Sequence, residues 1–254
     1  MPMDPRLTSL TPEKLLAALG DLLMPRGCIV CGRTLIPGER HLCCSCLAEL
    51  PLTHFERMPR NPMADSFNGR LSEESHTEYL HAAALFSYDR DGGFDRISKD
   101  VKYGRNFAAG RWFGAMLGKR LCASGLYSGV DIVCCVPLHW ARRFRRGYNQ
   151  AEIIASAVTG QLPGAVAEPR LLERMRHTRS QAGLGTEEKA ANVAGAFAVR
   201  RAVAQRHSGA RHILIVDDVF TTGATMAECA KALMRAFGPG IRISAATLAY
   251  ADGR

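Results

Sequence analysis

Two adjacent carboxylates and a run of hydroxyl side chains stand at one junction of the sequence. The apolar residues 213–216 are followed by Asp217 and Asp218, and then by the short segment Thr221, Thr222, Gly223, Ala224 and Thr225. The pattern predicts a buried strand that ends in two acids and turns into a helix, so the acids should lie at the strand's carboxyl end, where open α/β sheets bind ligands. Backbone N–H groups and hydroxyls at a helix N-terminus suit a phosphate, which Gly223 lets the backbone approach. The alternative is that Asp218 and Thr222 only cap the helix, but capping requires neither two consecutive acids nor three threonines and a glycine.

This junction resembles the phosphoribosyl pyrophosphate (PRPP) signature of type I phosphoribosyltransferases. The resemblance implies that Asp217 and Asp218 contact the ribose hydroxyls and are the catalytic acids, and that residues 221–225 hold the 5′-phosphate. It also implies Mg²⁺ bound together with PRPP. The sequence departs from the signature at Phe220, where the family usually has a smaller apolar residue or tyrosine. Because phenylalanine is apolar as well, we expect it to be tolerated.

A second group suited to phosphate follows another apolar run, residues 131–136. Pro137 ends that run, and four arginines stand within residues 142–146. Guanidinium groups bind phosphate oxygens through paired hydrogen bonds. The residues predicted to take the pyrophosphate are therefore Arg142, Arg145 and Arg146, and Pro137 is counted with them as a substrate-site residue at the end of the strand. The alternative is a solvated basic turn. Residues 146–150, Arg-Gly-Tyr-Asn-Gln, resemble the Arg-Gly-Phe-Asn-Gln signature of the ComF family, which is phosphoribosyltransferase-like and in some members tied to natural transformation.

Two further segments are similar to the same family. Residues 174–181 follow its Arg-x-Arg-x-Thr-x-x-Gln pattern, which implies substrate contacts for Arg176 and Gln181. A polar surface loop is the alternative there. The pair Lys102-Tyr103 resembles a Lys-Tyr pair of the family and implies that Lys102 reaches the site, with a solvated lysine on a helix as the alternative. The resemblance spans about residues 24–250 in the family's order.

The cysteines form a separate motif near the start of the chain. Cys28 and Cys31 make one CxxC pair and Cys43 and Cys46 a second, so two knuckles can supply the four corners of a tetrahedral zinc site. A redox role is the rival, but redox chemistry needs one CxxC pair rather than two. His41 could replace one thiolate, which we weigh as the lesser alternative. The zinc is expected to be structural because four thiolates close the coordination sphere. The remaining cysteines away from this motif are predicted to be ordinary buried residues: Cys122, Cys134, Cys135 and Cys229.

Composition limits the class of protein. The chain has 254 residues, 47% of them hydrophobic, which supports a sizeable core. Its formal net charge of +9 favours anionic partners such as phosphates or nucleic acid. The apolar run 15–24 is interrupted by Gly20 and Asp21, which does not fit a secretory signal, and no run approaches the roughly 20 apolar residues of a membrane span. We therefore expect a cytoplasmic location and no membrane insertion.

Alternating strand and helix patterns must position these residues. Strands are predicted near 79–88, 131–136, 166–172, 213–216 and 241–250, with helices near 94–121, 149–159 and 225–237. This alternation predicts an α/β fold with a parallel sheet flanked by helices, and the resemblance implies the type I phosphoribosyltransferase fold. The predicted divisions are an N-terminal helix (11–24) and zinc-binding module over 1–56, a polar, proline-containing linker over 57–78, and a phosphoribosyltransferase-like domain over 79–254.

The resemblance implies that any catalysed reaction displaces pyrophosphate from PRPP, with an acceptor that the sequence does not name. Arginines and Mg²⁺ would stabilise the charge on the departing pyrophosphate. A different class is a non-catalytic factor that handles single-stranded DNA and uses the fold as a scaffold, and a third is a PRPP-sensing regulator. The net charge of +9 cannot separate these classes, since the same arginines serve pyrophosphate and DNA. Single-stranded DNA and other competence proteins are the partners that the ComF resemblance adds to PRPP.

Overall fold

The computed structural model describes residues 26–71, 79–138, 143–144, 147–175, 194–238 and 240–251. The chain divides into two compact units, Met1–Leu50 and Pro51–Arg254, which are described separately. The helix predicted over residues 11–24 lies outside the described residues. Among those that are described, no helix combines the length and the apolar character needed to cross a bilayer.

The larger unit is built on a five-stranded sheet in the order β1–β7–β6–β2–β3, and every neighbouring pair is parallel. The strands are β1 (Ala82–Ser87), β7 (Arg242–Tyr250), β6 (His212–Phe220), β2 (Ile132–Cys135) and β3 (Val166–Ala167). The central strands are near-continuous apolar runs, as expected where helices cover both faces of a parallel sheet. The predicted α/β fold with a parallel sheet flanked by helices is confirmed.

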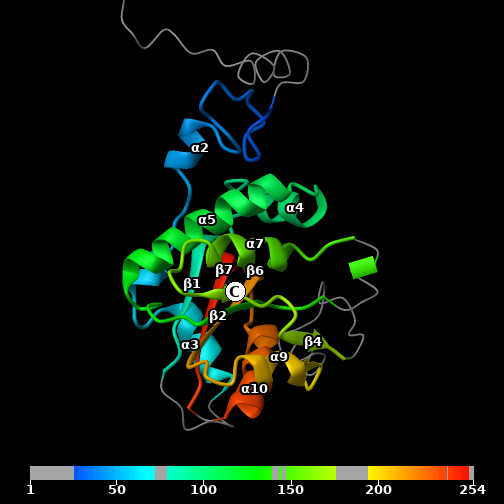
Figure 1. Ribbon diagram of the computed structural model, residues 1–254. Helices are drawn as coiled ribbons and strands as arrows, with labels where there is room; N and C mark the ends of the chain where they lie inside the picture. Colours follow the sequence, from blue (N-terminus) through cyan, green and yellow to red (C-terminus); the bar gives the residue numbers. More distant parts are fainter. Residues whose placement is uncertain are drawn as a thin grey trace, which may run out of the picture. The chain divides into compact units, whose positions relative to one another are not determined.

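Helices pack on both faces of this sheet (Figure 1). One face carries α4 (Asp95–Tyr103), α5 (Phe107–Ser124) and α7 (Gln150–Thr159), and the other carries α3 (Pro62–Gly69) and α10 (Ala224–Phe237). Helices α5 and α7 approach closely, because a Cβ added at Gly118 would meet the Val158 carbonyl oxygen at 2.9 Å. On the opposite face, Phe67 of α3 and Leu233 of α10 share a buried cluster with Ile213 and Ile215 of β6.

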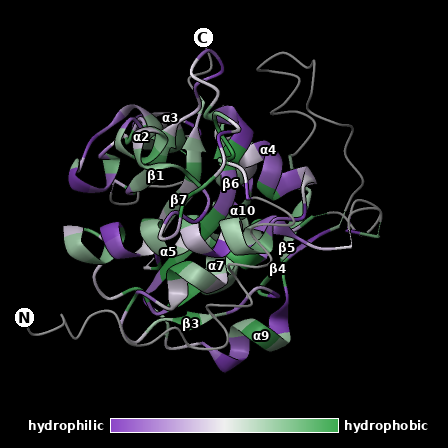
Figure 2. Ribbon diagram, turned by 90° about the horizontal axis from the view of Figure 1, so that it is seen from above, coloured by the Kyte–Doolittle hydropathy of each residue, from purple (hydrophilic) through white to green (hydrophobic). Residues whose placement is uncertain are grey.

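A second, smaller sheet and a short helix complete the larger unit as described. Strands β4 (Leu172–Arg174) and β5 (Phe197–Val199) pair in an antiparallel two-stranded sheet, and α9 (Arg201–Arg206) follows β5. The single strand predicted near 166–172 is thus two short strands in different sheets, β3 and β4. Figure 2 shows that α7 is mostly hydrophobic whereas α4 is mostly hydrophilic. Helix α4 nevertheless buries Asp95, Ile97, Ser98 and Val101, and its last turn carries Lys102.

The linker predicted over 57–78 is wrong for its described part, because that part contains α3. Asn61 caps this helix by accepting a hydrogen bond from Ala64 N at 2.9 Å, and its side-chain amide donates to Ala82 O of β1 at 2.9 Å. Phe67 of α3 is completely buried. The Asn-Pro dipeptide that suggested a linker is a helix start, with asparagine at the N-cap and Pro62 at the first helical position.

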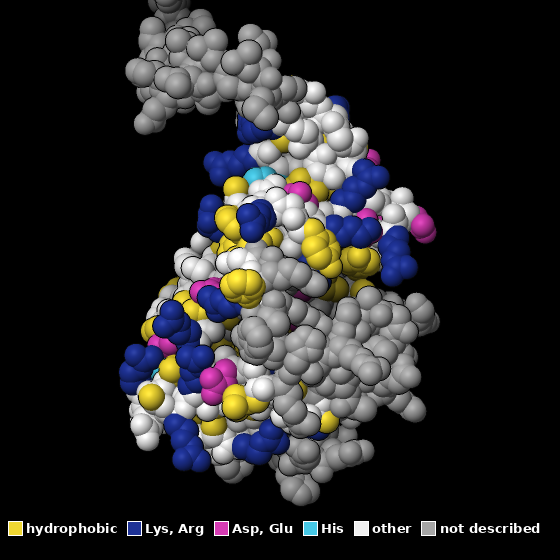
Figure 3. Space-filling view, turned by 90° about the vertical axis from the view of Figure 1, so that its right-hand side faces the viewer, with side chains coloured by type: hydrophobic (Ala, Val, Ile, Leu, Met, Phe, Trp, Pro, Cys, Tyr) yellow, Lys and Arg dark blue, Asp and Glu magenta, His cyan; other side chains and the backbone are white. Residues whose placement is uncertain are grey.

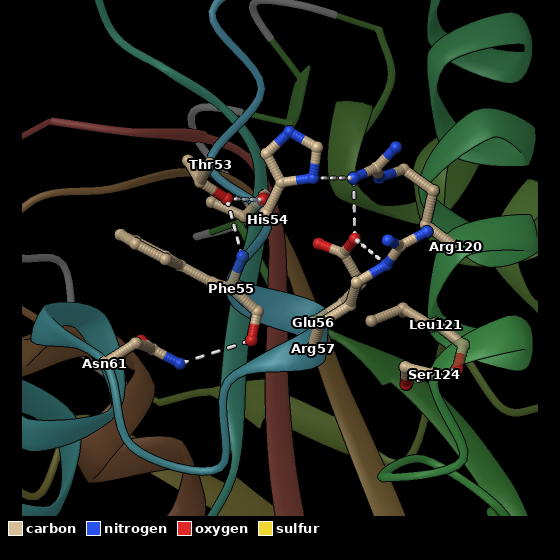
Figure 4. Close-up of polar contacts among 10 residues, drawn as sticks. Thr53, His54, Phe55, Glu56, Arg57, Asn61, Arg120, Leu121 and Ser124 are labelled. Atoms are coloured by element: carbon tan, nitrogen blue, oxygen red, sulfur yellow. Dashed lines mark hydrogen bonds and ion pairs between the residues drawn. The ribbon is translucent and has the colours of Figure 1, made fainter.

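The boundary predicted after residue 56 also lies inside the larger unit. The short 3-10 helix η2 (Phe55–Arg57) packs against β1 and α5, and its Glu56 is only 2% exposed. Figure 4 shows the guanidinium of Arg120 between Glu56 and His54: Nη2 of Arg120 donates to Glu56 Oε1 at 2.6 Å and lies 2.8 Å from His54 Nδ1. This partly buried ion pair ties the segment to α5, in agreement with a larger unit that starts at Pro51.

Candidate functional site

The acid pair lies inside β6 rather than just after it. The strand continues four residues past the predicted end at Val216 because it pairs with β7 as far as Phe220 opposite Tyr250. Its pairing with β2 stops earlier, at Val216 opposite Cys135. Asp217 and Asp218 therefore follow the last residue paired with β2, at the carboxyl edge of the sheet where α/β folds bind ligands.

Asp218 is buried among three polar partners. Its Oδ2 lies 3.0 Å from Lys102 Nζ and accepts a hydrogen bond from Gln150 Nε2 at 3.3 Å. Its Oδ1 accepts from Val219 N at 2.9 Å. Burial lowers the pKa of Lys102, but the charge of Asp218 and its hydrogen bond outweigh that effect and raise it. The structure thus brings Lys102, from the last turn of α4, to the acid pair.

The carboxyl group of Asp217 has fewer polar partners among the described residues than that of Asp218. Its Oδ1 accepts a hydrogen bond from Asp218 N at 2.8 Å. Burial and the neighbouring charge of Asp218 raise the pKa of Asp217 well above the ordinary value of an aspartate. One lysine ammonium group therefore faces two carboxyl groups, an arrangement stabilised by hydroxyl donors or by a further cation.

The residues after the pair form a turn that only glycine can complete. Gly223 is the N-cap of α10 and adopts a φ of +74°, and a Cβ there would meet Phe220 Cζ at 2.6 Å. Phe220 is buried and stacks on Tyr250. The glycine has no side chain to cap the helix, and the carboxylates bond to Lys102, Gln150 and backbone amides of β6 instead. These contacts favour the ligand interpretation of the acids over the capping interpretation.

The Arg-Gly-Tyr-Asn-Gln motif connects three elements around Asp218. The Tyr148 hydroxyl donates to the backbone carbonyl of Lys102 at 3.1 Å, which fixes the end of α4. The Asn149 side chain donates to Val136 O at 3.1 Å, after β2, and caps α7. Gln150 reaches Asp218 directly. The roles of Tyr148 and Gln150 could not be predicted from the sequence, because their partners are distant in the chain.

The other predicted site residues are only partly described. Pro137 is buried just after β2, whose last residues pair with β6. Arg142, Arg145, Arg146, Arg176 and Gln181 lie outside the described residues. Of the arginine segment, Arg143 pairs with Glu152 at 3.5 Å, and Phe144 is 89% exposed.

Within the smaller unit, the four predicted cysteines come together. The sulfurs of Cys28, Cys31, Cys43 and Cys46 all lie within 4.8 Å of one another. A tetrahedron with Zn–S bonds of about 2.3 Å has S···S edges of about 3.8 Å. The sulfurs of Cys31 and Cys43 are 3.8 Å apart. An all-thiol set of this size fits a structural zinc ion, with the ligands that the sequence predicted.

The backbone of this unit shapes both knuckles. Gly32, with a φ of +75°, donates its N–H to Cys28 O at 2.9 Å, and Cys46 N approaches Cys43 Sγ at 3.5 Å. Burial raises the pKa of Cys28, but hydrogen bonds with the backbone of Cys31, Cys43 and Val30 outweigh it and lower that pKa to about 7. A thiol of this kind is readily deprotonated to the ligand form.

Outside the cluster, one cysteine prediction is wrong. Cys134, Cys135 and Cys229 are buried as predicted, whereas Cys122 is exposed. Cys122 lies in the last turn of α5, past the buried residue Leu121, so the helix turns its side chain away from the sheet.

Comparison with known proteins finds curated relatives that match part of this chain. Competence protein F of Haemophilus influenzae is 37% identical over 108 residues, which is 41% of this chain and 44% of that protein. DNA utilization protein YhgH is 34% identical over 105 residues in both Salmonella typhi and Escherichia coli K12, with the same coverage. The chain therefore spans less than half the length of these relatives, and no family model matches it. These relatives confirm the resemblance to the ComF family.

Proposed function

We propose that this chain is a PRPP-binding protein of the phosphoribosyltransferase type that acts in DNA utilisation. The observation that carries the proposal is the acid pair of β6, with Asp218 buried and Asp217 partly buried, a few residues before the glycine N-cap of α10 at the carboxyl edge of a parallel sheet. The names of the relatives, Competence protein F and DNA utilization protein YhgH, support the biological setting.

In this proposal each part of the ligand has its own partner. The ribose hydroxyls donate to Asp217 and Asp218, and the 5′-phosphate accepts hydrogen bonds from the backbone and hydroxyls of residues 221–225. Bound Mg²⁺ supplies positive charge to the pyrophosphate. The bond between the anomeric carbon and the pyrophosphate oxygen breaks, pyrophosphate leaves with the electron pair, and an acceptor lone pair forms the new bond while the acceptor's proton passes to water. Lys102 holds the charge of Asp218 in place for this step.

A thermal melt with and without PRPP and Mg²⁺ tests the proposal. A ligand at 100 times its dissociation constant stabilises the folded state by about 2.7 kcal/mol, which is about 5–11 °C for a unit of this size. The double variant Asp217→Ala/Asp218→Ala should fold and lose the shift, whereas Asp91→Asn, at an exposed acid, should keep it. A shift that persists in the double variant contradicts the proposal.

A second candidate function, binding of single-stranded DNA, has an observation of its own. Phe144 is 89% exposed and stands between Arg143 and Arg145, and Tyr103 beside Lys102 is 70% exposed. Exposed aromatic rings flanked by basic side chains stack bases and attract the nucleic-acid backbone. Figure 3 shows that Lys and Arg are frequent and acidic side chains few on the face drawn there.

The two candidates can be separated by competition. Single-stranded DNA is titrated against the protein without PRPP and then with PRPP and Mg²⁺ at saturation. A shared or adjacent site changes the DNA affinity between the two titrations, and the variant Phe144→Ala weakens it in both. Identical curves together with an unaffected Phe144→Ala variant contradict a DNA-binding role at this site.

A further inference from the structure

Arg70 brings a cation to the turn before α10 from a distant part of the chain. It follows α3 as the C-cap residue, and its Nε donates to the carbonyl oxygen of Thr222, 152 residues away in sequence. Thr222 directly precedes Gly223, where the helix starts. The Arg70 side chain therefore lies against the turn to which the proposed function assigns the 5′-phosphate.

The charge balance of the site explains why a cation is needed there. Residues 219–225 contain no basic side chain, and Asp217 and Asp218 precede them. Lys102 is engaged with Asp218 at 3.0 Å. A phosphate dianion beside two carboxyl groups is destabilised unless another positive group is close, because like charges at short range raise the energy of both.

The guanidinium of Arg70 can supply this positive charge to a phosphate and still donate to the Thr222 carbonyl oxygen. An arginine has five N–H donors, of which the Thr222 carbonyl takes one, and the planar fork matches phosphate oxygens. Among the described residues, no acidic side chain forms an ion pair with Arg70, so none of them neutralises its charge.

We propose that Arg70 binds the 5′-phosphate of the sugar phosphate, completing a site whose other half is the backbone of residues 221–225. This inference rests on the proposed function and goes beyond it, because it assigns part of the site to the end of α3. It predicts selectivity within one ligand: Arg70 serves the 5′-phosphate end of PRPP and leaves the pyrophosphate end to other groups.

Calorimetric titration with three probes tests this assignment: PRPP with Mg²⁺, ribose 5-phosphate, and pyrophosphate with Mg²⁺. Arg70→Gln should weaken PRPP and ribose 5-phosphate by about 10- to 100-fold, the loss expected for a charged hydrogen bond, and leave pyrophosphate unchanged. Arg70→Lys should recover part of the loss because it keeps the charge without the fork. The control Arg60→Gln removes the same charge from an exposed arginine, whose guanidinium lies over the ring of Tyr79, and should bind like wild type.

The results that would contradict the role of Arg70 differ from those that would contradict the proposed function. Equal binding of ribose 5-phosphate by wild type and Arg70→Gln overturns the role of Arg70 while the proposed function stands. Equal weakening of ribose 5-phosphate and pyrophosphate, with a lowered melting temperature, also overturns it, since Arg70 would then only hold the fold of the turn. Wild-type protein that binds neither PRPP nor ribose 5-phosphate overturns the proposed function together with this inference.

Discussion

Replacing Asp217 by asparagine should make the ligand-free protein more stable. Burial and the charge of Asp218 raise the pKa of Asp217. Between the unfolded and the folded pKa the folded state binds more protons than the unfolded chain, so this carboxyl lowers stability as pH rises through that interval. Asparagine keeps the oxygen that accepts from Asp218 N at 2.8 Å and removes the charge. Single stabilising substitutions commonly contribute about 0.5–2 kcal/mol, so we expect a gain in this range, which is about 1–8 °C in melting temperature.

A second aspartate, Asp131, provides a control in which replacement by asparagine should change the stability in the opposite direction. Asp131 Oδ2 accepts hydrogen bonds from Arg211 N at 2.7 Å and His212 N at 3.0 Å. The hydrogen bond from Arg211, followed by smaller contributions from His212, lowers the pKa of Asp131 despite some burial. Its carboxylate therefore contributes stability above the unfolded pKa that is lost as pH falls. Asp131→Asn removes that contribution and should destabilise the protein at neutral pH.

Differential scanning calorimetry between pH 5 and 8 measures both variants. The gain from Asp217→Asn should be larger at pH 8 than at pH 5, because protonation relieves the same cost in the wild type. The variant should also lose the shift caused by PRPP with Mg²⁺. A melting temperature for Asp217→Asn at or below that of wild type at pH 8 would refute the claim that the ligand-free site carries an electrostatic cost.

Two further predictions concern the metal and the pH response. Elemental analysis of protein purified without chelator should find one zinc per chain, and Cys28→Ser with Cys43→Ser should abolish it; zinc retained in that variant contradicts the ligand set. Burial, followed by the charge of Arg242, lowers the pKa of His212 to about 4. Between this pKa and the ordinary histidine value, the imidazole binds a proton in the unfolded chain but not in the folded state. Stability should fall by about 2 kcal/mol from pH 6.5 to 5, and His212→Gln should flatten this interval in denaturant titrations, whereas an unchanged slope would show that His212 is not its source.

The sheet and its helices could be predicted because their patterns are local. Short apolar runs between helical segments have few packing solutions other than a parallel sheet covered on both faces. The predicted strands near 131–136 and 241–250 and the helix near 149–159 correspond to β2, β7 and α7. The end of β6 was not predictable in the same way. Its last residues are held by pairing with β7, a contact between separate segments that the polar residues Asp217 and Asp218 conceal.

The candidate site shows the same limit. The acid pair and the cysteine pairs stand out because each motif is contiguous or nearly so. The contact from Gln150 to Asp218 spans 68 residues, and that from Arg70 to Thr222 spans 152. Neither contact has a local signature, since a glutamine in the first turn of a helix or an arginine just after one is ordinarily a solvated side chain. Such partners become visible only when the fold brings the segments together.

The polar contacts around Asp218 favour a particular form of the ligand. Tyr148 fixes the end of α4 and Gln150 binds the carboxylate itself, so Lys102 and Asp218 are held in place before any ligand arrives. That preorganisation leaves one ammonium group for two adjacent carboxyl groups, of which Asp218 is buried and Asp217 partly buried, and this is a deficit of positive charge. Free PRPP would add further negative charge at this edge of the sheet. A ligand that carries its own divalent cation offsets the deficit, and we therefore expect the magnesium complex of PRPP to bind far more tightly than PRPP alone.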